Sequence, residues 1–216
     1  MKNRSQFIER YVLRPPLICY QIFVRYWLKI GVSQNRSDSD LNIGNFQFDN
    51  NGFMTAYFGN VQYLYAKCRK SAPSEIENFV DVGSGDGAVA YFMARKFPKL
   101  RCYGIEIDSS LHDLAMNHIS DDTSNLRYLH ISALDWNFEL LLKNSSVLFF
   151  FNSFGKDSLR VFLTKLMSYS QEKDVTLYFI YLNDVHRELF EERGIKNVYL
   201  NKRKQSIWQI SQSNNL

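Results

Sequence analysis

Phe79-Val80-Asp81-Val82-Gly83-Ser84-Gly85-Asp86-Gly87 is the stretch that decides the fold of this chain. Its apolar first half is typical of a strand, its second half is a glycine-rich turn, and the apolar residues 88–94 that follow predict a helix. Glycine is needed where the backbone turns at positive φ and approaches a ligand without an intervening Cβ atom. Because the free N–H groups of the helix start would face that ligand, the unit predicts a nucleotide site.

The charges beside the turn select the nucleotide. Gly83-x-Gly85-x-x-Ala88, followed by Glu106 about 20 residues on, also satisfies the dinucleotide fingerprint. However, Asp81 and Asp86 would repel a pyrophosphate, whereas S-adenosyl-L-methionine (SAM) brings an ammonium and a sulfonium that attract carboxylates. We therefore expect SAM as the cofactor, and a nicotinamide enzyme is the alternative.

The next predicted strand, residues 101–107, supports the same assignment. It carries Glu106 near its end, where a ribose diol needs an acceptor with two oxygens. Asp108 is expected instead to cap the helix that begins near Ser109.

The motifs of residues 81–87 and of Tyr103-Gly104-Ile105-Glu106 resemble those of the class I SAM-dependent methyltransferases, over about residues 50–211. The resemblance implies an α/β fold with a Rossmann-like, mostly parallel seven-stranded sheet, a C-terminal antiparallel hairpin and helices on both faces. It also implies that SAM is the methyl donor. The positions expected to contact the cofactor are Asp81, Gly83, Ser84, Gly85, Asp86, Gly87, Glu106, Ile107, Ser132, Ala133 and Asn152.

Ser132 departs from the family pattern. Many members carry an Asp-Ala pair at the end of the third strand, where the Asp binds the adenine amino group, but here Ser132 precedes Ala133. A hydroxyl can still accept one hydrogen bond, and Asp135 lies three residues on. We therefore expect a looser contact with adenine.

Asn152 is the predicted catalytic residue. Residues 147–151 form a continuous apolar run, typical of a central parallel strand covered on both faces. A polar side chain directly after such a strand faces the ligand crevice, which places Asn152 where the methyl group should react. A strand-end cap is the other interpretation of this residue.

Asn152-Ser153-Phe154 carries two further resemblances. It is similar to the Asn-Asn-Phe run of the disruptor-of-telomeric-silencing type of lysine methyltransferases, and to the Asn-Pro-Phe run of a group of uncharacterised bacterial class I methyltransferases. Ser153 stands where the lysine enzymes have a second Asn, and Phe53 where they have a Glu. The match to methyltransferases of nucleic-acid bases is poor, because this chain lacks their two prolines.

These observations predict a SAM-dependent methyltransferase (an EC 2.1.1 transferase) that acts on a nitrogen or oxygen acceptor of unspecified identity. The alternatives are a protein lysine N-methyltransferase and a SAM-binding regulatory or scaffold protein without turnover.

Composition bounds the organisation of the chain. Its 216 residues, 45% of them hydrophobic, suffice for one core. We expect an N-terminal helical extension and linker over residues 1–45 and the methyltransferase domain over residues 46–216. The net charge of +4 is too mild to indicate a nucleic-acid partner. The three cysteines are far apart and the four histidines lack ligand spacing, so neither disulfides nor a metal site is expected and a cytoplasmic location fits.

The two ends of the chain carry basic residues. Pro15-Pro16 should begin a helix whose apolar run is too short to span a bilayer, so residues 1–30 are predicted to pack on the domain, to contact a second subunit or to lie on a membrane surface. Near the C-terminus, residues 197–200 and 206–210 predict a hairpin. Its turn contains Lys202, Arg203 and Lys204. This basic cluster is either a solvated hairpin tip or a contact with an acidic substrate.

Overall fold

The computed structural model describes residues 14–28, 56–72, 74–140, 142 and 145–211. The expected linker and the first 13 residues lie outside the described residues. The α-helices are α2 (Arg14–Leu28), α3 (Phe58–Ser71), α4 (Ala88–Lys96), α5 (Ser109–Met116), α6 (Lys156–Lys173) and α7 (Glu188–Glu191). Two short 3-10 helices are η3 (Asp121–Thr123) and η4 (Phe138–Leu140). The strands are β1 (Asn78–Val82), β2 (Arg101–Glu106), β3 (Leu126–His130), β4 (Ser146–Phe151), β5 (Leu177–Leu182), β6 (Lys196–Asn201) and β7 (Gln205–Ile210).

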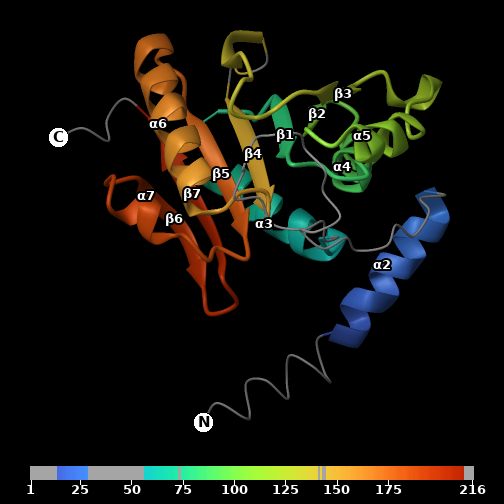
Figure 1. The fold of residues 1–216 in the computed structure, drawn as a ribbon. Coiled ribbons are helices and arrows are strands. Elements are labelled where there is room, and N and C mark those ends of the chain that lie inside the picture. The colour runs from blue at the N-terminus through green and yellow to red at the C-terminus, as the bar shows by residue number, and fades with distance from the viewer. Residues whose placement is uncertain (1–13, 29–55, 73, 141, 143–144, 212–216) are drawn as a thin grey trace.

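The strands form one seven-stranded sheet in the order β3-β2-β1-β4-β5-β7-β6 (Figure 1). The first five strands are parallel, and β7 pairs antiparallel with both β5 and β6. The predicted fold class is therefore confirmed. Leu182, the last residue of β5, pairs with Gln205, the first of β7. The turn between β6 and β7 thus lies at the edge where the parallel strands end.

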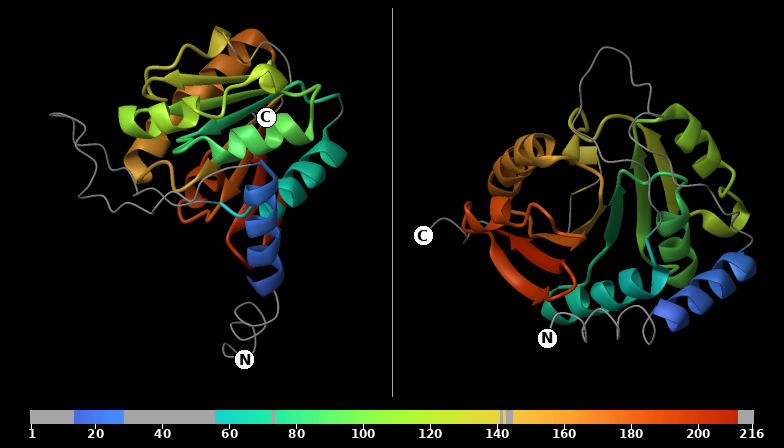
Figure 2. Two further views of the ribbon diagram at one scale, coloured as in Figure 1. Left: turned by 90° about the vertical axis from the view of Figure 1, so that its right-hand side faces the viewer. Right: turned by 60° about the horizontal axis from the view of Figure 1, so that its bottom comes forward.

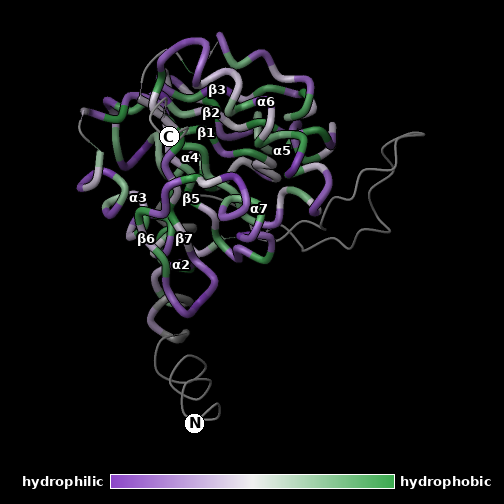
Figure 3. The backbone as a smooth tube through the Cα atoms, turned by 90° about the vertical axis from the view of Figure 1, so that its left-hand side faces the viewer, coloured by the Kyte–Doolittle hydropathy of each residue, from purple (hydrophilic) through white to green (hydrophobic). Residues whose placement is uncertain are grey.

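Helices cover both faces of the sheet (Figure 2). Alternate strand residues point to opposite sides, so Phe79 and Phe149 join the core beneath α3 and α4, while Leu148 and Phe179 join the core beneath α6. The strands run through the middle of the molecule as hydrophobic segments (Figure 3). Burial on both faces explains why β4 and β5 read as continuous apolar runs in the sequence.

The α2 helix packs against α3 through a buried polar side chain. Gln21 Oε1 accepts a hydrogen bond from the Phe58 backbone N–H (2.8 Å), and Gln21 Nε2 donates to the Ala56 carbonyl (3.2 Å). The N-cap residue of α3, Tyr57, makes no side-chain cap, so Gln21 replaces it from another helix. The packing alternative for α2 is therefore realised, while contact with a membrane or a second subunit stays a prediction.

Three further details concern α7, the cysteines and the length of the helices. Helix α7 begins only at Glu188, because Val185 N–H donates back to the Asn183 carbonyl (2.7 Å) and closes a turn before the helix begins. Cys19 is exposed, whereas Cys68 and Cys102 are buried, and no described cysteine is in a disulfide. No described helix is both long and apolar enough to cross a bilayer.

Candidate cofactor and acceptor site

The glycine-rich turn lies between the ends of β1 and β2. Gly83, Gly85 and Gly87 all have positive φ, at 71°, 56° and 76°. The backbone N–H groups of Gly83 and Ser84 both donate to the Ile105 carbonyl at 2.9 Å, so the turn is fixed to β2. This geometry leads directly into α4 at Ala88, as the sequence predicts.

Two close approaches explain why side chains are excluded at Gly83 and Gly87. A Cβ atom on Gly83 would lie 2.8 Å from the Ser153 Cβ, and one on Gly87 would lie 2.6 Å from the Tyr128 ring. Ser153 also donates a hydrogen bond to the Val82 carbonyl. Ser153 therefore joins the end of β4 to the end of β1, which the sequence analysis did not anticipate.

Tyr128 on β3 is a second residue that the sequence analysis missed. It pairs in register with Gly104 on β2, and its ring fills the space that a Gly104 side chain would take. Its hydroxyl donates to the Gly87 carbonyl at 2.7 Å. An aromatic residue facing a glycine on the neighbouring strand is a signal visible in the sequence, but only once the strand register is known.

Asp81 is the electrostatic centre of the site. It is only 3% exposed, and its Oδ2 atom has no hydrogen-bond partner among the described residues. Burial raises the pKa of Asp81 well above its ordinary value, and the nearby Glu106 and Asp86 carboxylates raise it further. The three acids are thus brought together, and they favour a cation beside them.

Glu106 holds the glycine turn in addition to its predicted role. Its Oε2 accepts the Gly85 N–H at 2.7 Å, and its Oε1 accepts the N–H groups of Ile107 (2.8 Å) and Asp108 (2.9 Å). Burial raises the pKa of Glu106, and these backbone donors oppose that shift. A carboxylate can accept about four hydrogen bonds, so the capacity for a ribose hydroxyl remains. Asp108 caps α5 through Leu111 N–H (2.9 Å), as predicted.

The remaining predicted cofactor positions surround the same edge. Asp86 Oδ1 accepts the Ala88 N–H at 3.2 Å and so caps α4. Ser84 is buried, and its hydroxyl has no described partner. Ser132 accepts the Leu134 N–H (3.2 Å), while Ala133 is buried in the core on the α6 side. Ser132 therefore stabilises its own turn, and its contact with adenine stays a prediction.

Asn152 pairs with another asparagine, Asn183, which follows β5. Both have positive φ, at 55° and 60°, and Asn183 Nδ2 donates to Asn152 Oδ1 at 2.6 Å. Asn tolerates this left-handed conformation better than most residues, so both strands can turn sharply at the same edge. The predicted catalytic residue thus has its amide orientation fixed by a partner 31 positions away.

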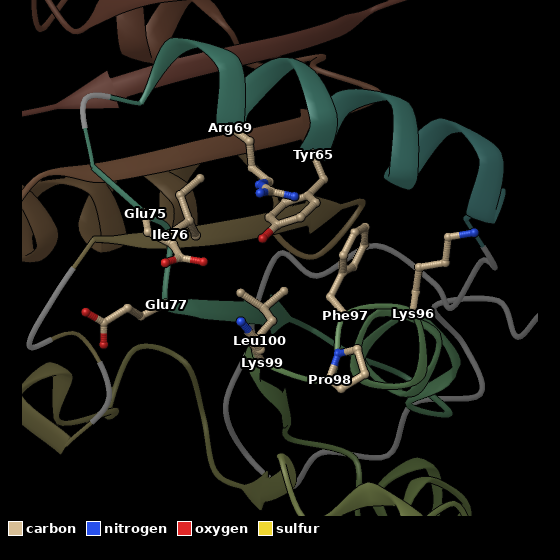
Figure 4. A pocket seen from close by; sticks show the side chains of 10 residues that line it. All are labelled: Tyr65, Arg69, Glu75, Ile76, Glu77, Lys96, Phe97, Pro98, Lys99 and Leu100. Atoms are coloured by element: carbon tan, nitrogen blue, oxygen red, sulfur yellow. The ribbon is translucent and has the colours of Figure 1, made fainter.

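Two cavities lie outside the glycine turn. One, of about 770 Å³, separates α7 from the β6–β7 turn and has Asp184 in its lining. Burial raises the pKa of Asp184, against the opposing influence of Ser206. The other, of about 490 Å³, lies beneath α3 at the opposite edge, where β1 and β2 begin (Figure 4). Among the described residues, no group of His, Cys, Asp and Glu could hold a metal ion.

Residues 76–154 match the model of the family described as "Putative methyltransferase". That segment contains the glycine turn, Glu106, Tyr128 and Asn152. A comparison with proteins of curated function finds no relative by sequence.

Solved structures of methyltransferases share the fold. The structure described as "delta-N METTL16 MTase domain" has a TM-score of 0.56 at 9% identity, covering 91% of this chain and 94% of that chain. The N-terminal domain of human METTL16 in complex with SAH gives 0.54 at 9% identity, with 90% and 80% covered. The "Human methyltransferase 10 domain containing protein" gives 0.52 at 8% identity, with 74% and 84% covered. At these identities the likeness is one of fold.

Proposed function

Because the chain has the fold of the class I SAM-dependent methyltransferases and matches a methyltransferase family over residues 76–154, we propose that it transfers a methyl group from SAM to a nitrogen or oxygen acceptor. The acceptor would bind where β4 and β5 end, beside Asn152 and Asn183. The alternative is a SAM-binding regulatory or scaffold protein without turnover, and an assay of methyl transfer distinguishes the two.

The observation that carries the proposal is the unpaired carboxylate oxygen of Asp81. Asp81 has a backbone hydrogen bond with Ala90, but its second oxygen is buried without a partner, which is costly, and two further acids beside it increase that cost. A cationic ligand would relieve both penalties. The chemistry of the site therefore fits SAM and disfavours the pyrophosphate of a dinucleotide.

When bound, SAM supplies a methyl group that its sulfonium already makes electrophilic. The work left for the protein is to orient the acceptor in line with the carbon–sulfur bond and to exclude water. We assign the orienting role to Asn152, because the bond from Asn183 fixes which way its amide points. The acceptor itself would supply the electron pair for this methyl group and would lose its proton to solvent, so the protein needs no nucleophile of its own.

Isothermal titration calorimetry with SAM, with its demethylated product and with NAD tests the cofactor. We expect the wild type to bind SAM and its product and not NAD, and Asp81→Asn to lose at least about tenfold in SAM affinity, the equivalent of 1.4 kcal/mol. Asp113→Asn, which removes an exposed acid of α5, is the matched control and should bind SAM as the wild type does. NAD binding, or an equal loss in both variants, would contradict the proposal.

Turnover needs a second readout, for which we choose the conversion of SAM to its demethylated product in the presence of a cell extract that supplies candidate acceptors. The wild type should release product and transfer a labelled methyl group, and Asn152→Ala should lose this transfer while SAM binding persists. Binding of SAM without any transfer would favour the regulatory or scaffold alternative.

A further inference from the structure

Two neighbouring elements carry positive charge without any acidic residue. Helix α3 and the hairpin 196–210 together hold seven of the 26 lysines and arginines and none of the 22 acids. The two elements lie next to each other, because Tyr63 of α3 contacts Tyr199 of β6. The net charge of the whole chain hides this asymmetry, since the acids are concentrated elsewhere.

The centre of this surface is a cluster that we call the basic-aromatic strip, made of Tyr63, Lys67, Tyr199 and Arg203. The Tyr63 and Tyr199 rings meet edge to face at 6.2 Å, with their hydroxyls 3.3 Å apart. Lys67 Nζ lies over both rings, 5.5 Å and 5.7 Å from their centroids. Tyr63 is 48% exposed, so an aromatic side chain and a cation are offered to solvent side by side.

The strip is positively charged at its centre. The pKa of Tyr199 is lowered, first by the Tyr63 hydroxyl and then by Asn201, Lys67 and Arg203. Three acids, Asp184, Glu188 and Glu191, share the 770 Å³ cavity with Lys202 and Lys204 of the basic turn. Arg203 does not line that cavity and influences the two tyrosines instead. Of the three basic residues in the turn, Arg203 is therefore the one that belongs to the strip.

The strip leads to the proposed acceptor site. Arg203 belongs to the turn that follows β6, and Gln205 after it pairs with Leu182, the residue before Asn183. The Lys204 carbonyl also accepts the Asp184 N–H at 2.9 Å, which fixes the turn to the end of β5. A long ligand on the strip would thus reach the edge where Asn152 and Asn183 meet.

We propose that the basic-aromatic strip binds the backbone and bases of a single-stranded nucleic acid and delivers one of its nucleotides to the acceptor site. Phosphates would pair with Lys67 and Arg203, and exposed aromatic rings are the stacking platform that single strands use. A membrane surface would instead require exposed aliphatic side chains beside the cations, whereas the exposed Leu200 of this hairpin lines the cavity beside α7 and the strip offers tyrosines. This inference rests on the proposed function only for the methyl transfer that follows binding.

Fluorescence anisotropy of labelled 20-nucleotide RNA and DNA single strands, titrated with the full chain at several salt concentrations, tests the inference. We expect the wild type to bind and Lys67→Gln/Arg203→Gln to lose at least about tenfold in affinity. Because each phosphate contact to a single strand contributes about −0.7 to the slope of log affinity against log salt, the double variant should flatten that slope by about 1.4. Tyr63→Ala should weaken binding about fivefold or more without changing the slope.

The matched control is Lys96→Gln/Lys99→Gln, which removes two exposed cations from the opposite edge of the sheet and should bind as the wild type does. Absence of wild-type binding at low salt, an equal loss in the control, or binding only to vesicles of phosphatidylglycerol and phosphatidylcholine would overturn the inference. SAM titrations of the same variants separate the two proposals. Asp81→Asn should lose SAM and keep the oligonucleotide, and the strip variant should do the reverse.

Discussion

At the scale of single residues, Asp81 combines a stability cost with the cofactor-binding role that we propose for it. Its raised pKa means that the folded chain holds this proton more tightly than the unfolded chain. Between the ordinary value of 3.8 and the raised pKa, the free energy of unfolding of the ligand-free protein should therefore fall as pH rises. Glu106, whose pKa is also raised, contributes in the same direction.

Asp81→Asn should remove the part of this slope that belongs to Asp81. We expect the variant to be more stable than the wild type at pH 7, because burial and the neighbouring acids disfavour the charged form of Asp81 and an amide carries no charge. Urea unfolding at several pH values between 4 and 8 measures both curves. If the free energy of unfolding had the same pH dependence in both proteins, the charge of Asp81 would be compensated in the folded state.

Gly83 and Gly194 require glycine for different reasons, backbone conformation alone at Gly194 and a close side-chain contact as well at Gly83. Both have positive φ, but a Cβ atom on Gly83 would collide with Ser153, whereas one on Gly194 would have no atom within 4 Å. Gly194→Ala should cost about 1–2 kcal/mol from backbone strain alone, and Gly83→Ala about 2–4 kcal/mol because overpacking adds to that strain. Urea unfolding measures both, and equal losses would mean that Ser153 moves aside without cost.

At the scale of elements, α2 and α3 depend on one side chain. Gln21 satisfies the Phe58 N–H and the Ala56 carbonyl from a helix that is distant in sequence. Gln21→Ala should therefore lower the free energy of unfolding by about 1–2 kcal/mol and speed hydrogen exchange at Phe58. Ile22→Ala, at a position that is 63% exposed, is the control and should change stability by less than about 0.5 kcal/mol. Similar effects of the two substitutions would argue against the cap.

The ends of β4 and β5 depend on each other through a bond between two side chains. Each ends in an asparagine at positive φ, and the two side chains bond to each other. If Asn152 orients the acceptor as proposed, Asn183 is its positioning residue, although nothing in its own segment of sequence distinguishes it from an ordinary turn asparagine.

At the scale of the whole molecule, ligand binding should couple to global stability. The glycine turn is fixed to β2 by Glu106 and Ile105 and to β3 by Tyr128, so a ligand there depends on three strands at once. SAM at 100 times its dissociation constant should add about 2.7 kcal/mol to the free energy of unfolding, which raises Tm by about 5 °C or more in a chain of this size. Differential scanning calorimetry measures the shift. Asp81→Asn should show a smaller shift at the same SAM concentration, and an unchanged one would remove Asp81 from the site.

The sequence by itself determined the glycine turn, the order of strands and helices, the charge of the cofactor site and the Asp108 cap, because these depend on residues within a few positions of one another. It also located Asn152 through the apolar run before it. Only the tertiary structure decided that Tyr128 closes on Gly87, that Asn183 orients Asn152 and that two acid-free elements meet at Tyr63 and Tyr199. The physical reason is that these contacts join residues 41, 31 and 136 positions apart, whose proximity arises from strand register and helix packing and leaves no periodic trace in the chain.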